Sequence, residues 1–116
     1  MKLEHFKISE FKCKCGCDEN RMDKAFLHMI DSARDRAGVG FRINSGYRCP
    51  DHEKAIGGKG NHSKGIAADI KTANLRIRFI ILSALIDAGF NRIGIAKTFI
   101  HIDTSETKSQ QVIWLY

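Results

Sequence analysis

An aspartate interrupts an otherwise apolar run, Ile66-Ala67-Ala68-Asp69-Ile70. A short apolar run of this kind predicts a buried strand. Burying a carboxylate is costly unless it meets a cation or hydrogen-bond donors. Any fold of this chain must therefore supply a partner for Asp69. The preceding segment is polar and rich in glycine, and it holds His62, seven residues before Asp69.

A second histidine lies in Phe99-Ile100-His101-Ile102-Asp103, which we read as a strand. Side chains alternate between the two faces of a strand, so Phe99, His101 and Asp103 share one face while Ile100 and Ile102 fill the core. Convergence of His62, Asp69 and His101 on one metal is geometrically reasonable. Three protein ligands leave the fourth position of a tetrahedral zinc ion open, which is typical of a catalytic site. The alternative is that these histidines are ordinary surface or core residues.

The remaining periodicity predicts an α+β domain with a small, mostly antiparallel sheet and two main helices. A first amphipathic helix runs from about Met22 to Ala37, with Asn20 as its N-cap and Gly38 at its end. A second follows Thr72 or Asn74 and ends at Gly89. Its predicted buried stripe is Leu75, Phe79, Leu82, Leu85 and Ile86. Strands are predicted at residues 41–44, 66–70, 92–95, 99–103 and 112–115, with a long loop from 45 to 63 and a tight turn at 96–98.

Size and charge limit the classes of function. The 116 residues suit one domain, residues 1–116, and contain no apolar stretch long enough to span a bilayer. The net charge of +6 comes from dispersed basic residues, so we expect it to steer anionic partners rather than to bind nucleic acid. The N-terminus lacks the apolar core of a signal peptide, which favours a cytoplasmic protein until release. We expect a monomer with no membrane partner.

Four cysteines stand at positions 13, 15, 17 and 49. The C-x-C-x-C spacing is tighter than that of a common zinc knuckle. The three clustered residues together with Cys49 could hold a metal or form disulfides. One or two of them could instead pack as small apolar side chains in a reducing compartment.

Several motifs, in one order along the chain, resemble the zinc D-Ala-D-Ala carboxypeptidase family, peptidase family M15, whose fold is shared with the hedgehog signalling domain. They are Ser45-Gly46-Tyr47-Arg48, Gly57-Gly58, the segment from His62 to Asp69, Gly94-Ile95, and Phe99 to Asp103. The segment from Phe11 to Cys17 also resembles the lead-in of small members, which phages and prophages often encode.

The resemblance implies a zinc peptidase that acts at the bacterial cell wall on peptidoglycan stem peptides, either as a D-Ala-D-Ala carboxypeptidase or as an endolysin-type endopeptidase. His62, Asp69 and His101 would bind Zn²⁺. Arg48 would face the site and hydrogen-bond the scissile carbonyl or the oxyanion, although an ion pair is its other reading. Candidates for substrate binding are Ser45, Tyr47 and Ser63, but the first two also suit a role in shaping the loop, and Ser63 suits a turn cap.

The chain departs from the family pattern at the general base. Many members have an acidic residue three positions before the last zinc histidine, or a histidine two positions before it, and these positions are Thr98 and Phe99 here. Asp103 could act as the catalytic base or accept a hydrogen bond from a ligand imidazole, and we favour the second role. Asp51 and Glu53 are further candidates.

Two other classes of function remain open. A zinc-stabilised module that binds cell wall or a protein without catalysis is favoured by the missing base. A basic nucleic-acid-binding domain held by cysteine-bound zinc would need its metal at Cys13, Cys15 and Cys17.

Overall fold

The computed structural model describes residues 3–17, 19–58 and 60–116. Within them the elements are, in chain order, a 3-10 helix η1 (Ile8–Phe11), α1 (Lys24–Ala37), β1 (Ile43–Ser45), α2 (Pro50–Ala55), β2 (Ala67–Lys71), α3 (Leu75–Asp87), β3 (Arg92–Ile95), β4 (Phe99–Asp103) and β5 (Val112–Leu115). The predicted α+β class is confirmed.

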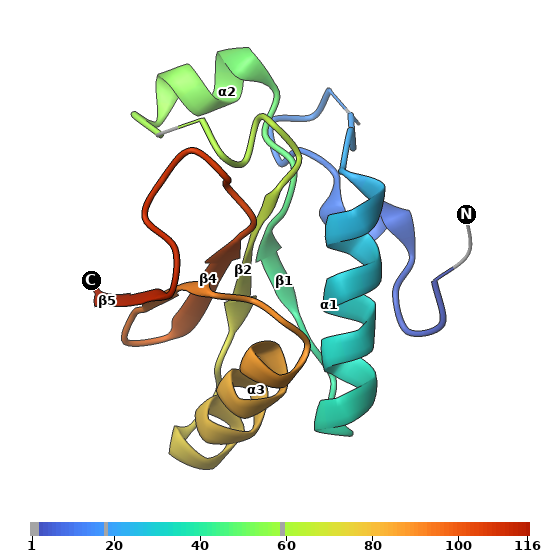
Figure 1. The fold of residues 1–116 in the computed structure, drawn as a ribbon. Coiled ribbons are helices and arrows are strands. Elements are labelled where there is room, and N and C mark those ends of the chain that lie inside the picture. The colour runs from blue at the N-terminus through green and yellow to red at the C-terminus, as the bar shows by residue number, and fades with distance from the viewer. Residues whose placement is uncertain (1–2, 18, 59) are drawn as a thin grey trace.

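The five strands form one sheet in the order β1-β2-β4-β3-β5. The pairs β1/β2, β2/β4 and β4/β3 are antiparallel, and the pair β3/β5 is parallel. The long strands β2 and β4 therefore lie side by side at the middle of the sheet (Figure 1). Residues of β2 and β4 that face each other come from segments about thirty positions apart in the sequence, such as Asp69 and His101.

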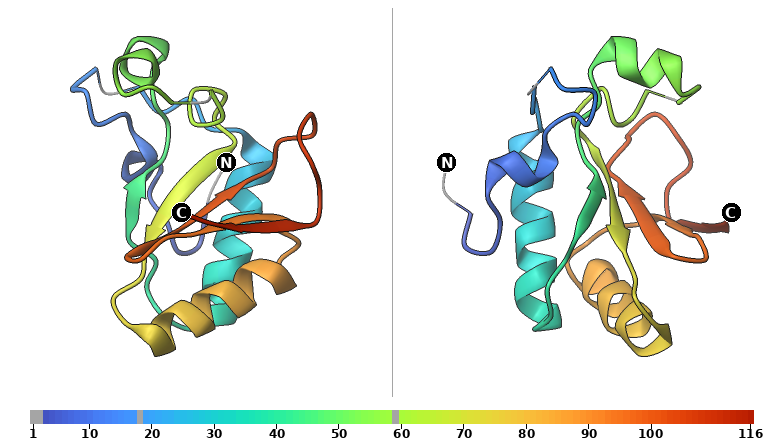
Figure 2. Two further views of the ribbon diagram at one scale, coloured as in Figure 1. Left: turned by 90° about the vertical axis from the view of Figure 1, so that its left-hand side faces the viewer. Right: turned by 180° about the vertical axis from the view of Figure 1, so that it is seen from behind.

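The two faces of the sheet differ in character. Helices α1 and α3 pack against each other and cover one face (Figure 2). The core between them and the sheet holds Phe26 and Ile30 of α1 and Leu85 of α3, packed with Ile100 and Ile102 of β4. The opposite face carries the polar residues of β2 and β4. As predicted, alternation along β4 sends its isoleucines to the core and its histidine to the other side.

Helix α1 begins three residues later than Asn20 predicts. Asp23 is the N-cap, because its side chain accepts a hydrogen bond from the backbone N–H of Phe26 at 2.9 Å. Gly38 ends the helix in the left-handed conformation, with φ of 68°, as expected. The N-cap prediction was wrong because asparagine and aspartate cap equally well, and Asn20 and Asp23 both stand before the helical period.

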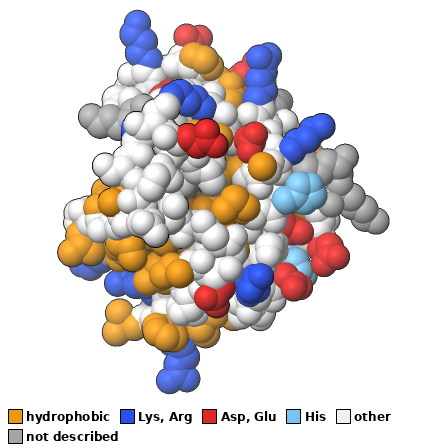
Figure 3. All heavy atoms as spheres, viewed as in Figure 1, with side chains coloured by type: hydrophobic (Ala, Val, Ile, Leu, Met, Phe, Trp, Pro, Cys, Tyr) orange, Lys and Arg blue, Asp and Glu red, His pale blue; other side chains and the backbone are white. Residues whose placement is uncertain are grey.

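The predicted buried stripe of α3 is mostly wrong. Leu75, Phe79 and Ile86 are 78%, 71% and 48% exposed, while Ile81 and Leu85 are fully buried. Figure 3 shows hydrophobic side chains gathered over this helix. The helix is apolar on nearly every side, so its periodicity does not distinguish one face. Asn74 is its N-cap, as one of the two predictions had it. None of the helices in the described ranges has the length and hydrophobicity needed to cross a bilayer.

The segment 45–63 is not one continuous loop, as was predicted. It contains α2, which begins at Pro50 and has Cys49 as its N-cap residue. Proline is favoured in the first turn of a helix because the missing N–H has no helical partner there anyway. Helix α2 stands at one end of the sheet, beside the turn that carries His62 (Figure 1). The element is only six residues long, which is too short for a hydrophobic period to be read.

Candidate metal centre and cavity

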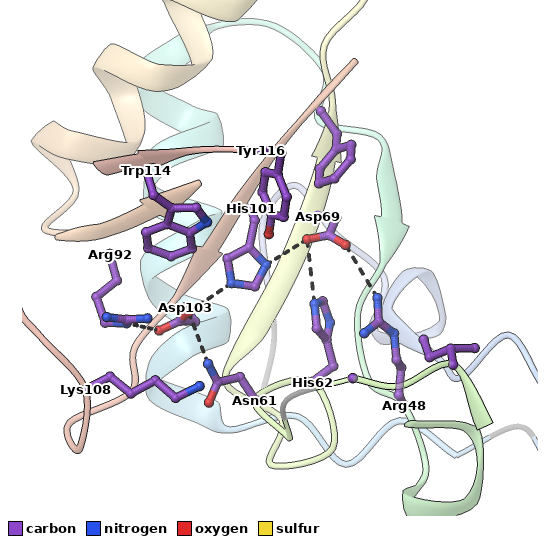
Figure 4. Close-up of a pocket in the computed structure, with 13 residues that line it drawn as sticks. Arg48, Asn61, His62, Asp69, Arg92, His101, Asp103, Lys108, Trp114 and Tyr116 are labelled. Atoms are coloured by element: carbon purple, nitrogen blue, oxygen red, sulfur yellow. Dashed lines mark hydrogen bonds and ion pairs between the residues drawn. The ribbon is translucent and has the colours of Figure 1, made fainter. Parts of the chain in front are cut away.

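A cavity of about 540 Å³ opens on the face of the sheet that the helices leave uncovered. Strands β2, β3, β4 and β5 contribute its floor and one wall, and the segments around Arg48 and His62 contribute another (Figure 4). Asp69 and His101 lie on its floor. Apolar side chains of Ile56, Phe99 and Trp114 line it beside these polar groups.

His62, Asp69 and His101 converge at this floor. One donor atom from each lies within 4.8 Å of the other two. The Nδ1 atom of His101 is 2.8 Å from Asp69 Oδ1, and the Nε2 atom of His62 is 3.6 Å from the same oxygen. The side chains of His62, Asp69 and His101 are 7%, 15% and 9% exposed. The three groups therefore share a small, nearly enclosed space.

Strand register accounts for one half of this cluster. Asp69 on β2 is the direct cross-strand partner of His101 on β4. Directly opposed residues in an antiparallel pair have their Cβ atoms about 5 Å apart, so an imidazole and a carboxylate there meet without strain. The apolar neighbours Ala68 and Ile70 fill the core, which fixes the register and leaves Asp69 on the open face.

The Ser45-Gly46-Tyr47-Arg48 segment accounts for the other half. His62 donates its Nδ1–H to the carbonyl of Gly46 at 2.8 Å, which leaves the lone pair of Nε2 facing Asp69. Gly46 is packed against the backbone of Phe11, because a Cβ at position 46 would lie 2.8 Å from the Cα of Phe11. Only glycine lets this carbonyl reach His62 while the N-terminal segment lies against it.

Asp103 lines the same cavity and contacts the ring nitrogen of His101 that does not face Asp69. Its Oδ2 accepts a hydrogen bond from Nε2 of His101 at 2.9 Å and from Asn61 at 3.2 Å. Its Oδ1 accepts from Nε of Arg92 at 2.7 Å and from the backbone N–H of Ser105 at 3.1 Å. The Asp103 side chain has no exposed surface. It thus fixes the tautomer and orientation of His101, with Nδ1 directed at Asp69.

The charged groups shift one another's pKa in a consistent direction. Burial opposes ionisation of Asp69, but the neighbouring imidazoles of His101 and His62 outweigh it and hold the Asp69 pKa well below its usual range. Burial also disfavours ionised Asp103, yet His101 and Arg92 lower its pKa to about 2. Burial lowers the pKa of His101, whereas Asp103 and Asp69 raise it, and the net direction is upward. The cluster therefore attracts a positive charge between His101 and Asp69.

Arg48 connects the cluster to α2. Its guanidinium lies 3.6 Å from Asp69 Oδ2 and 3.1 Å from Glu53 Oε1, and its Nε donates to Ser45 Oγ at 3.0 Å. Glu53 is buried, and its second oxygen accepts from the backbone N–H of Ser63 at 3.0 Å. Arg48 thus lines the cavity and makes the ion pairs of its second predicted reading, while its hydrogen bond to a substrate carbonyl stays a prediction.

The three predicted substrate-binding residues lie behind the cavity wall. Ser45 accepts from Arg48, the backbone of Tyr47 donates to Phe11 O at 2.7 Å, and Ser63 Oγ donates to Gly60 O at 2.9 Å. Among the described residues that line the cavity, these three do not appear. Their contacts shape the loops that carry Arg48 and His62, and direct binding of substrate stays a prediction.

Several residues of the site were not predicted from the sequence. Asn61, Arg92, Lys108, Trp114 and Tyr116 line the cavity. The Trp114 indole lies over Gly94, where a Cβ would be 2.5 Å from its Nε1 atom. One of them, Arg92, could have been predicted, because an arginine at the start of the apolar segment 92–95 requires a buried partner. The pairing of β5 with β3 is non-local, so no pattern along the chain pointed to Lys108, Trp114 or Tyr116.

The donor set suits a divalent transition metal. Two imidazoles and one carboxylate form a common ligand set of catalytic zinc sites. The hydrogen bonds from His62 to Gly46 O and from His101 to Asp103 leave one nitrogen of each ring aimed at the shared space. Hydrogen-bonded histidines of this kind accompany metal sites in general. The residues present therefore fit a metal ion held by His62, Asp69 and His101.

A polar cavity floored by two histidines and a carboxylate is a ligand arrangement typical of metal-dependent hydrolases. A family model described as Peptidase M15 matches residues 2–103, and the chain belongs to this family of metallopeptidases. The resemblance seen in the sequence motifs is confirmed at the level of the family. No curated protein matches the chain significantly.

Proposed function

We propose that the protein is a zinc-dependent peptidase that hydrolyses the stem peptides of bacterial peptidoglycan, as a D-Ala-D-Ala carboxypeptidase or as an endolysin-type endopeptidase. The observation that carries this proposal is the convergence of His62, Asp69 and His101 at the floor of an open cavity, in a chain of the M15 family. A zinc ion in such a site supplies Lewis-acid polarisation of a carbonyl and activation of water.

Two cationic side chains in the cavity suit a peptide substrate. Arg48 lies beside Asp69, where its guanidinium would donate hydrogen bonds to the scissile carbonyl as negative charge develops on it. Lys108 lies on the exposed loop that follows β4 and lines the same cavity. Stem peptides carry free carboxylates, and we propose that Lys108 binds one of them.

We propose Glu53, and not Asp103, as the group that accepts the proton of the attacking water. Asp103 has no exposed surface, and His101 and Arg92 occupy its oxygens. The carboxylate of Glu53 fills the space that a Cβ of Gly58 would need, and Gly58 lines the cavity. A single guanidinium, that of Arg48, separates Glu53 from Asp69. Movement of Arg48 onto substrate would free Glu53 Oε1 to accept the proton.

Variants of the proposed ligands test the site. His62→Ala, Asp69→Ala and His101→Ala are each expected to lower zinc affinity and to abolish release of fragments from a synthetic stem pentapeptide, measured by mass spectrometry. His28→Ala removes an exposed histidine of α1 and serves as the matched control with zinc and activity retained. Retention of the full wild-type zinc content by all three ligand variants would refute the assignment.

The substitution Glu53→Gln tests the base. The expected result is unchanged zinc content with hydrolysis reduced by about 10²–10⁴-fold, the usual contribution of a positioned base. Gln keeps the shape and one acceptor oxygen for Arg48, while its NH₂ group meets the Ser63 N–H, so circular dichroism is used to check that the variant folds. Normal turnover in this variant would exclude Glu53 and leave the base unassigned.

One observation favours a second candidate, a zinc-stabilised module that binds cell wall without cleaving it. Asp69, Asp103 and Glu53 each already face a cationic or imidazole partner. Zinc-loaded protein that binds peptidoglycan sacculi in a pelleting assay, yet releases no fragments, would establish this alternative in place of hydrolysis.

A further inference from the structure

A second cluster of metal-ligand side chains lies away from the cavity. It contains all four cysteines of the chain, Cys13, Cys15, Cys17 and Cys49. Their sulfur atoms lie within 4.8 Å of one another, and all four are free thiols. Three come from the turn after η1 and the fourth is the N-cap residue of α2, more than thirty positions later.

The N-terminal turn is built to bring the first three together. Gly16 adopts a φ of 96°, a conformation that side chains with a Cβ rarely reach, and this reverses the chain between Cys15 and Cys17. The backbone N–H of Cys13 donates to Glu19 O at 2.7 Å and closes the turn. The backbone N–H of Cys49 donates to Cys13 Sγ at 3.3 Å, which is a contact that stabilises a thiolate.

The spacing of the sulfur atoms matches a single bound ion. Cys13 Sγ lies 3.3 Å from Cys15 Sγ, which lies 3.5 Å from Cys49 Sγ. A zinc–sulfur bond of about 2.3 Å with tetrahedral angles places neighbouring sulfur atoms about 3.8 Å apart. The observed pairs are close to this edge length, and contraction or expansion of a few tenths of an ångström completes the tetrahedron.

We propose that Cys13, Cys15, Cys17 and Cys49 bind one zinc ion in a closed, four-thiolate structural site, separate from the His62–Asp69–His101 centre. Binding releases the thiol protons to solvent and forms four Zn–S bonds, with no change in oxidation state. Tetrahedral coordination by four sulfurs is a strong preference of zinc among the divalent metals.

The two other uses of these cysteines explain the geometry less well. Packing as small apolar side chains requires burial, but Cys15 and Cys17 are exposed and only Cys13 is fully buried. A disulfide joins two sulfurs and gives no reason for four to approach a common point. A shared ion explains why the exposed thiols of the turn face Cys13 and Cys49.

The proposed site would tie the N-terminal segment to the wall of the cavity. Cys49 directly follows Arg48 and starts the helix that carries Glu53. The backbone of Tyr47 already donates to Phe11 O on the other side of the same junction. Zinc at the cysteines would hold this junction closed and so fix the position of Arg48. The existence of the second ion does not depend on the peptidase proposal.

Zinc stoichiometry of the full chain, purified without chelator in the presence of a thiol reductant, tests the inference. The expected content is two zinc ions per chain for the wild type and one for Cys15→Ser/Cys17→Ser. These two residues are chosen because both are exposed, so the core is left intact. His101→Ala is expected to retain one ion, and the combined variant none. His5→Ala, in an exposed acidic cluster, is the matched control and is expected to keep two.

Cobalt substitution identifies which site is filled. The intense thiolate-to-cobalt charge-transfer absorption is expected in the wild type and in His101→Ala, and it is expected to disappear in Cys15→Ser/Cys17→Ser. Amide hydrogen exchange in residues 43–49 is expected to quicken in the double cysteine variant, while circular dichroism confirms that it folds.

Three results would overturn the four-cysteine site. They are one zinc per chain in the wild type, two zinc ions retained by Cys15→Ser/Cys17→Ser, or disulfides detected by mass in protein purified under reductant. Loss of hydrolysis with both ions bound would instead count against the peptidase proposal alone. The two proposals therefore fail in different experiments.

Discussion

Replacing Asp103 by asparagine separates a positioning role from a role as the base. An aspartate at this position accepts four hydrogen bonds, two on each oxygen. The amide of asparagine has one acceptor oxygen, so its NH₂ group must face either Arg92 or His101. If the oxygen stays with Arg92, the Nε2–H of His101 meets another donor. If it turns to His101, the guanidinium of Arg92 faces the NH₂ group of the asparagine. The Arg92 side chain is only 9% exposed, so water cannot readily replace the lost acceptor.

The expected magnitudes follow from these contacts. Loss of the acceptor behind a ligand histidine typically lowers metal affinity about 10–100-fold, or about 1.4–2.7 kcal/mol. Leaving a buried cation without its partner costs about 3–5 kcal/mol of unfolding free energy. We expect the lower end of that range, because Arg92 keeps a 2.6 Å hydrogen bond to Ser109 O.

Zinc affinity is measured by competition with a chromophoric chelator, and stability by urea denaturation of the metal-free protein. Asp87→Asn, at the exposed end of α3, is the matched control and is expected to change neither quantity. Arg92→Met combined with Asp103→Asn removes the unpaired cation, so the stability loss should shrink while the loss of zinc affinity remains. Unchanged zinc affinity with hydrolysis abolished would refute the positioning role and make Asp103 the base.

Three further predictions concern other parts of the site. In metal-free protein the raised pKa of His101 makes protonated His101 a stabilising group, so its contribution to the free energy of unfolding is complete below about pH 6.5 and is lost as the pH rises through the raised pKa. Urea denaturation across this range should show the free energy of unfolding falling with pH, and His101→Gln should remove this dependence. Gly46→Ala places a Cβ 2.8 Å from the Phe11 backbone and should destabilise the fold by about 1–3 kcal/mol, whereas Gly40→Ala, whose Cβ would meet only a side-chain atom at 3.9 Å, serves as its control in thermal unfolding. Lys108→Ala should raise KM for a stem peptide severalfold with little change in kcat, and an equal fall in kcat would contradict a binding role.

Local patterns predicted the parts of the fold in which burial and sequence period agree. The alternation in Phe99–Asp103 placed His101 and Asp103 on one face, and the structure confirms that arrangement. The apolar run around Asp69 predicted a strand, and β2 spans Ala67–Lys71. The turn at 96–98 joins two short strands as expected.

Features that depend on tertiary packing were not predictable in this way. Helix α3 is apolar on several faces, so only its packing against α1 decides that Ile81 is buried and Phe79 exposed. The partners of Asp103 come from β3 and from the turn before His62, and their approach depends on a strand order that the sequence does not reveal. The four cysteines raised a metal as one alternative, but the location of Cys49 beside the N-terminal turn required the structure.

The most direct test of the central claim is the mass of fragments released from whole peptidoglycan by the zinc-loaded protein, compared with protein stripped by a chelator and with Asp69→Ala. We expect new fragments only with the zinc-loaded wild type. Loss of a terminal alanine would identify a carboxypeptidase, and cleavage within the stem would identify an endopeptidase. No new fragment from protein shown to hold its zinc would contradict the proposed hydrolysis.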